Sequence, residues 1–424
     1  MNTKLQCNRS AARKAGYAIL IGGAGLFGIV SVVLAGNADA VDLEVYRAGG
    51  ETVLAGGDLY GAPVWYDFRF TYPPFAALVF TPLALLGTAA AKALVAVLNG
   101  VLLAFVVARS WRSLGVRGRR LVPAVIAVTG ASFALESVHS NFIDGQINLL
   151  LVTLVLADLT GRADHRARGV GVGIAAGLKL TPLIFVAYLV AARRYRQAAV
   201  ASACAAGTVL VSFLLVPAAA GDFWLGGRFA DLSRIHTDPA SRHNQSLRGL
   251  LMKTGVPEAP ALVLWLLLGA AAGLGALALA VRAARRGEHL LAVSLCGLCG
   301  AMVSPWSWGH HWVWLVPFGV FLVWVAGRPR RRGRWLPAMV LVALTVPGLL
   351  ALADPMDDDA KPVLAGGPLA FVLGNIYVLI FVVALVAAVL DLRAPRDARC
   401  AGGPRRRTGS GPAEQRETAP GAAG

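Results

Sequence analysis

The sequence predicts an all-α, polytopic integral membrane protein. Of its 424 residues, 57% are hydrophobic and only 15% are charged, and the mean hydropathy is +0.63. Ordinary soluble domains carry roughly 25% charged residues. Apolar segments close to the roughly 20 residues needed to cross a bilayer recur along the chain. Hydropathy therefore indicates the class of protein before any motif is considered.

The apolar segments predict about 11–12 transmembrane or half-membrane helices. The longer ones, which approach a full span, are 16–36, 91–108, 121–138, 198–217, 260–281, 311–327, 336–353 and 371–391. The shorter ones are 74–88, 147–160, 169–192 and 290–304. Because Pro182 interrupts the helical pattern, 169–192 is expected to be a helical hairpin that turns around LKLTP (178–182).

The basic residues indicate orientation and not a nucleic-acid partner. The formal net charge is +17, but the arginines gather in short clusters between apolar segments, at 109–120, 161–169, 193–196, 282–286 and 328–334. Such clusters are typical of cytoplasmic loops. The N-terminus, which precedes a retained anchor at 16–36, and the C-terminus are expected on the same cytoplasmic side, with membrane lipids as a partner.

Polar residues gather on the opposite, outer side of the membrane. The first outer loop is expected at 37–73 and a second long outer loop at 218–258. If 74–88 and 91–108 both span the membrane, the arginine cluster at 109–120 would lie outside, against the charge rule. Either 74–88 is therefore partly re-entrant, or the rule fails once. Residues 1–394 are expected to form a single transmembrane domain, and 395–424 a disordered, basic cytoplasmic tail.

The first outer loop offers carboxylates at the membrane boundary. Asp39, Asp42 and Glu44 follow the first apolar segment, where a carboxyl group can be partly desolvated and still reachable. Any of them could act as a general base toward an acceptor hydroxyl. The alternative is that they only mark the water boundary, and spacing alone does not choose among them.

Two segments offer cations for an anionic substrate. Lys179 is the only charged residue within 169–192, and a lysine at a broken helix suits a phosphate, although snorkelling would also explain it. In the second outer loop, SRHNQSLRGLL contributes Arg242, Gln245 and Arg248, whose side chains suit a phosphate or sugar hydroxyls. A simple solvated loop is the alternative for that segment.

Two further polar stretches border apolar helices. ESVHSNFIDGQINLLL carries Glu136, His139, Asp144, Gln146 and Asn148. These side chains are expected either to line a cavity or to form hydrogen bonds between helices. Tyr72 precedes two prolines, which predicts an extended entry into a helix at the rim of an outer cavity, or simply a structural corner.

SPWSWGHH (304–311) is the most unusual stretch in the chain. Its tryptophans are typical of an interfacial aromatic belt, but His310 and His311 can also donate to a phosphate or a sugar hydroxyl near neutral pH. Adjacent histidines do not share a helix face, so they do not suggest a metal pair. We expect no metal ion and no cofactor.

Several short motifs occur in the order seen in the polyprenol-phosphate-mannose-dependent α-mannosyltransferases of glycosyltransferase family 87, which the sequence therefore resembles. They are D-x-x-x-Y (42–46), LY (59–60), YPP (72–74), GQ-x-N-L (145–149), LKLTP (178–182), NQS-L-x-G (244–249) and SP-x-SW-x-HH (304–311). The resemblance covers about 20 to 330. It implies a GT-C fold and an enzyme of the plasma membrane.

The resemblance also implies a reaction and a set of site residues. The reaction is inverting transfer of mannose from a polyprenyl-phosphate donor to a lipid-linked or polysaccharide acceptor outside the membrane, for the cell envelope. Asp42 matches the catalytic carboxylate of GT-C enzymes, and the histidine pair lies at the donor phosphate or the acceptor. The further residues expected to bind substrate are Lys179, Arg242, Arg248, Gln245, Gln146, Tyr46 and Tyr72.

Two alternatives remain open at the level of sequence. A transporter or flippase of a polyprenyl-linked glycan would suit the broken helix around Lys179. Its polar sites would, however, be expected near the membrane midplane and not on one face. A GT-C enzyme that transfers a pentose or a whole oligosaccharide is the other alternative.

Overall fold

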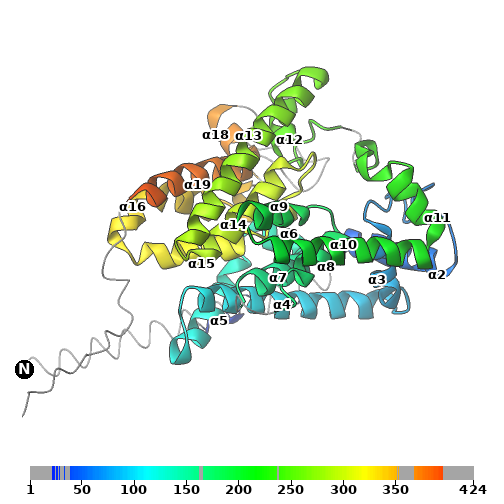
Figure 1. Cartoon of the computed structure of the whole chain (residues 1–424), viewed down its shortest axis with the longest axis horizontal. Helices are drawn as coiled ribbons and strands as arrows, with labels where there is room; N and C mark the ends of the chain where they lie inside the picture. Colours follow the sequence, from blue (N-terminus) through cyan, green and yellow to red (C-terminus); the bar gives the residue numbers. More distant parts are fainter. Residues whose placement is uncertain are drawn as a thin grey trace, which may run out of the picture. The chain divides into compact units, whose positions relative to one another are not determined.

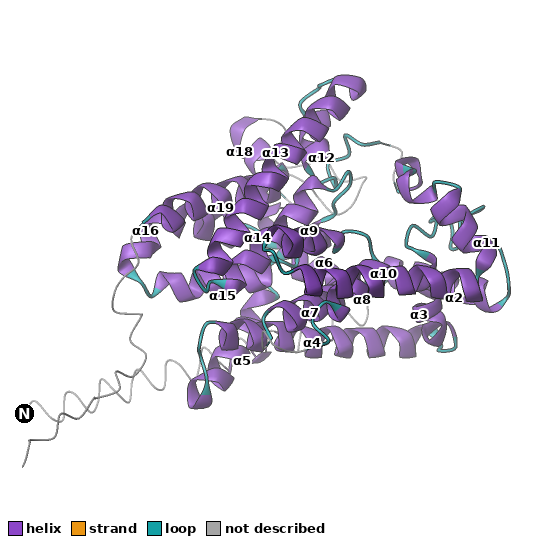
Figure 2. Ribbon diagram, viewed as in Figure 1, coloured by secondary structure: helices purple, strands orange, loops and turns teal. Residues whose placement is uncertain are grey.

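The computed structural model describes residues 39–161, 166–235, 238–350, 352 and 367–394, together with isolated positions between 22 and 33. Most of the predicted anchor at 16–36 and the whole predicted tail at 395–424 lie outside the described residues. The described residues are mostly helical and contain no β-strand (Figure 2). The prediction of an all-α protein is confirmed.

Long apolar helices make the chain a polytopic membrane protein. Of the described helices, four are long and apolar enough to cross a membrane: α4 (Thr88–Ser113), α10 (Tyr195–Leu215), α13 (Glu258–Arg285) and α19 (Ile376–Arg393). A further apolar pair, α5 (Leu121–Ser132) and α6 (Glu136–Ile143), is bent by 76° at the break between its two helices. Glu136 is the first residue of α6, directly after this break.

The other described α-helices are shorter. They are α2 (Val41–Leu54), α3 (Pro74–Ala84), α7 (Asn148–Leu159), α8 (Val170–Leu178), α9 (Leu183–Ala191), α11 (Pro217–Ala220), α12 (Leu247–Lys253), α14 (His289–Val303), α15 (Leu315–Ala326), α16 (Pro329–Ala343), α17 (Pro347–Leu350) and α18 (Gly367–Gly374). A 3₁₀ turn, η5 (Gly309–Trp312), carries the histidine pair.

Four helices pack in the order α4, α7, α8 and α10 (Figure 1). Glycines allow the closest of these contacts, because a Cβ at Gly173 would lie 2.5 Å from the Cβ of Cys204, and one at Gly177 would overlap Thr208. From the first contact to the second, the position on α8 and the position on α10 advance by the same number of residues. The two helices therefore run parallel. Small residues that let helix backbones approach are typical of packing within membranes.

The segment 169–192 contains the predicted break. Helix α8 ends at Leu178, the backbone of Lys179 is extended, and α9 begins at Leu183 after Pro182. Helix α7 begins at Asn148 and α8 ends beside it, where Lys179 Nζ donates to Asn148 Oδ1 at 3.1 Å. Leu159, at the end of α7, and Val170, at the start of α8, therefore lie at the opposite end of this helix pair from Lys179.

The first outer loop is more structured than the sequence predicts. Within 37–73 the chain forms α2, which packs against the 11-residue helix α3. Leu43, Val45 and Tyr46 on α2 are buried. The prediction missed this helix because its glycines, acids and arginine lower the hydropathy of the segment. Helix α3 is too short for a full span.

Candidate active site

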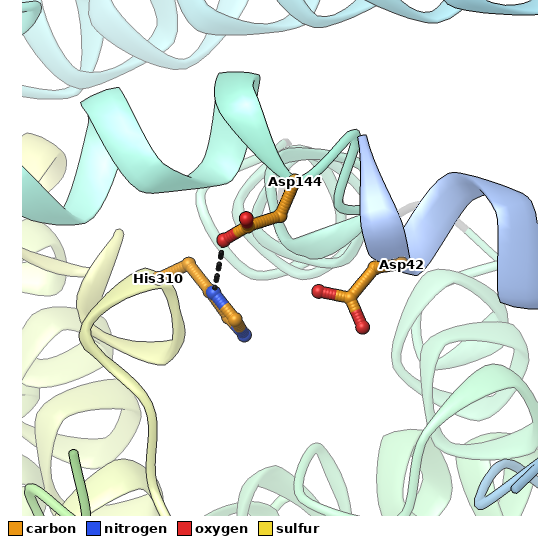
Figure 3. Close-up of side chains that lie close together, drawn as sticks. All are labelled: Asp42, Asp144 and His310. Carbon is orange, nitrogen blue, oxygen red and sulfur yellow. Dashed lines mark hydrogen bonds and ion pairs between the residues drawn. The ribbon is translucent and has the colours of Figure 1, made fainter. Parts of the chain in front are cut away.

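The site is built where the first turn of α2 meets the end of α6 and the SPWSWGHH loop. Asp42 comes from α2, Asp144 follows α6, and His310 comes from η5. One carboxylate or imidazole atom of each lies within 4.8 Å of the others. Figure 3 shows the three side chains converging from these separate elements.

A backbone contact holds the two aspartates together. The N–H of Leu43 donates to the carbonyl of Asp144 at 3.1 Å. Gly145, at φ 66°, follows directly, and a Cβ on it would lie 2.7 Å from the Cβ of Leu43. Only glycine combines this left-handed conformation with such a close approach. The start of α2 is therefore fixed against the end of α6.

Asp144 orients the imidazole of His310. His310 Nδ1 lies 3.1 Å from Asp144 Oδ2, and His310 is only 5% exposed. Burial lowers the pKa of His310 to about 4 and raises the pKa of Asp144 to about 7. A neutral His310 therefore donates its Nδ1–H to the ionised form of Asp144. Its Nε2 has no hydrogen-bond partner among the described residues.

Gln146 lies between Asp42 and the two tyrosines predicted to bind substrate, Tyr46 and Tyr72. Its Oε1 accepts from Tyr46 Oη at 2.8 Å and from Asn148 Nδ2 at 3.1 Å, and Tyr46 Oη lies 2.8 Å from Tyr72 Oη. Oε1 is the acceptor in these bonds, and the side chain of Gln146 also interacts with the Asp42 carboxyl and lowers its pKa. Burial is the main cause of the raised pKa of Asp42.

Lys179 supplies the cation of the site. Its Nζ lies 2.9 Å from Nε2 of His311 and 5.3 Å from the ring centroid of Tyr72. A narrow cavity of about 30 Å³ lies beside it, lined by Asn148, His311 and the apolar side chains Ile184 and Phe185 among others. Lys179 and His311, both predicted to bind substrate, thus lie together beside the cluster of Asp42, Asp144 and His310.

The second outer loop braces the SPWSWGHH loop. Asn244 Oδ1 accepts from the backbone N–H of Ser307 at 3.2 Å, and Gln245 N donates to Ser307 O at 2.7 Å. Asn244 is fully buried. This segment therefore holds His310 and His311 in place.

Some predicted residues lie elsewhere. The guanidinium of Arg248 pairs with Glu258 at 3.1 Å, and neither Arg248 nor Arg242 lines the cavity beside Lys179. Of the three carboxylates considered for the base, Glu44 pairs with Arg47 at 2.6 Å. Asp39 is exposed, which leaves Asp42 as the one at the cluster.

No individual role for Asp144 or Asn148 follows from the sequence. Asp144 bonds His310, a residue 166 positions away, and Asn148 joins Gln146 to Lys179. The signal available in the sequence was the polar stretch around IDGQIN between apolar segments. It could not identify the partners, because these lie on other elements.

Asp42, Asp144 and His310 could together hold a metal ion. Two carboxylates and one imidazole are ligands that a divalent cation such as Mn²⁺ accepts. The same three groups also suit acid–base chemistry, since an acid, a second acid and a neutral imidazole surround one space.

The fold and the site define a multi-pass membrane protein with a buried carboxylate, imidazole and ammonium cluster. The sequence model of glycosyltransferase family 87 matches residues 70–305. The chain therefore belongs to glycosyltransferase family 87, and it is a glycosyltransferase. This confirms the family that its motifs resemble.

Curated relatives extend the match. The chain is 35% identical over 316 residues to a polyprenol-phosphate-mannose-dependent alpha-(1-2)-phosphatidylinositol mannoside mannosyltransferase of Mycobacterium tuberculosis, covering 69% of this chain and 71% of that protein. It is 34% identical over 334 residues to the protein of the same name in Mycolicibacterium smegmatis, covering 72% and 74%. A pentamannoside mannosyltransferase of M. tuberculosis is 35% identical over 345 residues, with 75% of each chain covered. No solved structure matches the chain.

Proposed function

We propose that this glycosyltransferase transfers mannose from polyprenyl-phosphate mannose to a lipid-linked acceptor, with inversion, on the outer face of the plasma membrane. The names of the relatives support the donor, the sugar and a mannosylated lipid as the class of acceptor. The arrangement of Asp42 and Lys179 supports the single-displacement mechanism.

The observation that carries the proposal is a relay of two amide side chains between Asp42 and Lys179. Gln146 interacts with the carboxyl of Asp42 and lowers its pKa. It also accepts from Asn148 Nδ2 at 3.1 Å, while Asn148 Oδ1 accepts from Lys179 at 3.1 Å. A base and a cation are thereby held at a fixed separation. An inverting displacement requires this, because the hydroxyl attacks one side of the anomeric carbon and the phosphate leaves from the other.

In this mechanism Asp42 takes the proton of the acceptor hydroxyl as the new bond from its oxygen to the anomeric carbon forms. The bond between that carbon and the phosphate oxygen breaks at the same time, and polyprenyl phosphate leaves with the electron pair. Lys179 stabilises the negative charge that develops on the leaving oxygen. The apolar side chains Ile184 and Phe185 beside Lys179 suit the first isoprene units of the donor.

The position of the arginines supports chemistry on the outer face. Arg109, Arg112 and Arg117 line a cavity together with Thr160 and Gly161, beyond the end of α7. Asn148, at the start of α7, borders the Lys179 cavity. The 12 residues of α7 separate the two ends by about 18 Å at the α-helical rise. Because clustered arginines favour the cytoplasm, the Asp42 end is assigned to the outside.

The test is transfer of radiolabelled mannose from synthetic polyprenyl-phosphate mannose by the purified protein. The acceptor is a phosphatidylinositol mannoside, and the Asp42→Asn variant is compared with the wild type. We expect α-mannoside formation by the wild type and a rate about 10²–10⁴ lower in the variant, the range for loss of a general base. Glu44→Gln is the matched control, since Glu44 pairs with Arg47.

Two results would contradict the proposal in different ways. Movement of an intact lipid-linked glycan across liposomes without sugar transfer would indicate a transporter. Full activity of Asp42→Asn, with loss of activity in Glu44→Gln, would refute only the choice of base.

A further inference from the structure

A second, larger cavity borders the Asp42 cluster away from Lys179. Its volume is about 210 Å³. Asp144 and His310 form its border with the cluster. Its remaining lining residues are Glu136, Ser140, His243, Gln245, Trp308, Gly309, Pro347, Leu350, Leu373 and Tyr377. The proposed mechanism uses none of these.

The charge of the cavity lining does not suit a phosphate. Glu136 and Asp144 line it, and no lysine or arginine is among its described lining residues. The cation of the site, Lys179, lines the other cavity. The two cavities therefore differ in chemistry: one suits an anion with an apolar chain, and the other suits a neutral ligand rich in hydroxyl groups.

Two residues that line the cavity each carry a buried acceptor atom without a partner among the described residues. The two atoms are Oε1 of Gln245 and Nε2 of His310. The Nε2 of Gln245 donates to the carbonyls of Arg242 at 3.0 Å and Gly374 at 3.1 Å, so the acceptor end of this amide is fixed. Buried acceptors without partners are rare, and they call for a ligand that donates hydrogen bonds.

Tyr377 holds the Glu136 side chain in position. Its carboxylate accepts a hydrogen bond from Tyr377 Oη, and the ring of Tyr377 stacks on Trp312 at 5.2 Å. A side chain at position 309 would overlap this carboxylate, which explains the glycine before His310. A carboxylate can accept about four hydrogen bonds in total. The bond from Tyr377 therefore orients Glu136 without using up its capacity.

Trp308 supplies an apolar surface in the same cavity. The indole is half-buried, and it packs near His243, with ring centroids 5.8 Å apart, and near Trp306, at 5.2 Å. These neighbours restrict its rotation. A fixed aromatic ring beside several acceptors is the combination that recognises a sugar ring, whose faces carry C–H groups and whose edge carries hydroxyls.

We propose that this cavity is the acceptor subsite and binds the terminal hexopyranose of the acceptor glycan. Trp308 contacts a face of the ring, and Glu136, Gln245 and His310 accept hydrogen bonds from its hydroxyls. The hydroxyl to be mannosylated is thereby presented past His310 to Asp42. The inference rests on the proposed function for the identity of the reaction, but sugar binding by this cavity can be measured without it.

The experiment uses the full-length purified protein with octyl α-D-mannopyranoside as acceptor probe. Glu136→Gln and Trp308→Leu are compared with the wild type for the acceptor KM, the donor KM and the Kd of the probe by calorimetry. We expect the ratio of acceptor KM to donor KM, and the Kd, to rise about tenfold, the effect of losing about one good contact. Trp308→Phe, which keeps an aromatic ring, should restore most of the affinity.

Glu51→Gln is the matched control. Glu51 is on the exposed side of α2 and pairs with Arg47, which retains its bond to Glu44. A rise in donor KM without a rise in acceptor KM would assign the cavity to the donor and overturn the inference. If the wild type transfers no mannose, the proposed function fails. The Kd of the probe, measured by calorimetry, then tests sugar binding by the cavity on its own. Weaker probe binding in Glu136→Gln would support the subsite, and unchanged binding would refute it.

Discussion

The Nζ of Lys179 lies 2.9 Å from Nε2 of His311. An ammonium group has three donors and no acceptor, so Nε2 of His311 must accept and the imidazole is neutral. Burial lowers the pKa of His311 well below its usual value, and the nearby charge of Lys179 lowers it further. The pair thus presents one positive charge and not two. Two donors of Lys179 bond Asn148 and His311, and the third is left for a ligand.

This geometry predicts a specific effect of Lys179→Met. We expect kcat to fall about 10²–10³-fold, the usual cost of removing one donor that stabilises a developing oxyanion. The acceptor KM should change little. Steady-state kinetics with the donor and the acceptor varied in turn measure both quantities, and Lys92→Met in α4 is the control for a lysine elsewhere. A Lys179→Met enzyme with normal kcat would exclude Lys179 from the phosphate.

The pH dependence should report the burial of Asp42. Burial raises the pKa of this carboxyl, while His310, Gln146 and Lys179 lower it and the charge of Asp144 raises it. A general base works in its ionised form, so kcat/KM should rise with pH as Asp42 loses its proton. The midpoint of this acidic limb is expected above the ordinary pKa of an aspartate. His310, with its pKa of about 4, stays neutral above that midpoint.

Asp144→Asn tests this assignment. Because the negative charge of Asp144 raises the pKa of Asp42, its removal should move the acidic limb toward lower pH. A purely structural role of Asp144 would lower the rate at every pH without such a shift. A limb that moves upward would mean that another group is the base.

Gly145→Ala should damage both stability and activity. At φ 66° a non-glycine residue costs about 1–2 kcal/mol, and the new Cβ would also lie 2.7 Å from the Cβ of Leu43. Gly56 has the same φ, and a Cβ added there would meet open space, so Gly56→Ala bears only the backbone cost. Thermal unfolding in detergent should show the larger loss for Gly145→Ala. Only this variant should also lose transfer activity, since it displaces Asp42 from Asp144.

Several features of the site follow from local sequence. Pro182 and a single lysine in an apolar segment were sufficient to predict the break at Lys179, because proline removes a helical hydrogen bond whatever its surroundings. The choice of Asp42 over Asp39 and Glu44 came from the resemblance. The structure adds a physical reason, in that Glu44 is paired with Arg47 and Asp39 is exposed.

Other features depend on contacts that local patterns do not contain. The bond between Asp144 and His310 joins residues 166 positions apart, and Asn244 braces Ser307 from 63 positions away. Helix α2 was predicted as loop because its stability comes from packing on α3 and not from hydropathy. Arg242 and Arg248 are predicted to bind a phosphate or sugar hydroxyls from their side chains and their place in an outer loop. The local sequence does not reveal that Arg248 pairs with Glu258.

Chelation tests whether the Asp42, Asp144 and His310 cluster needs a metal. We expect EDTA to leave the transfer rate unchanged. A lipid monophosphate carries less charge than the diphosphate of a nucleotide sugar, so Lys179 can stabilise it alone. The rate is measured after dialysis against EDTA and again after addition of Mg²⁺ or Mn²⁺. A loss that either ion restores would instead assign a divalent cation to these three residues.

Single cysteines test the orientation. Ser233 and Arg119 are both exposed. Ser233 lies next to Arg234, which bonds the carbonyl of Tyr60 at 2.8 Å on the Asp42 side, whereas Arg119 follows α4 at the arginine-rich end. In intact cells, a membrane-impermeant maleimide should label Ser233→Cys and not Arg119→Cys, and cell lysis should make both reactive. The described native cysteines are buried or half-buried, which limits background. Labelling of Arg119→Cys alone in intact cells would place Asp42 in the cytoplasm, where an exoplasmic acceptor could not reach it.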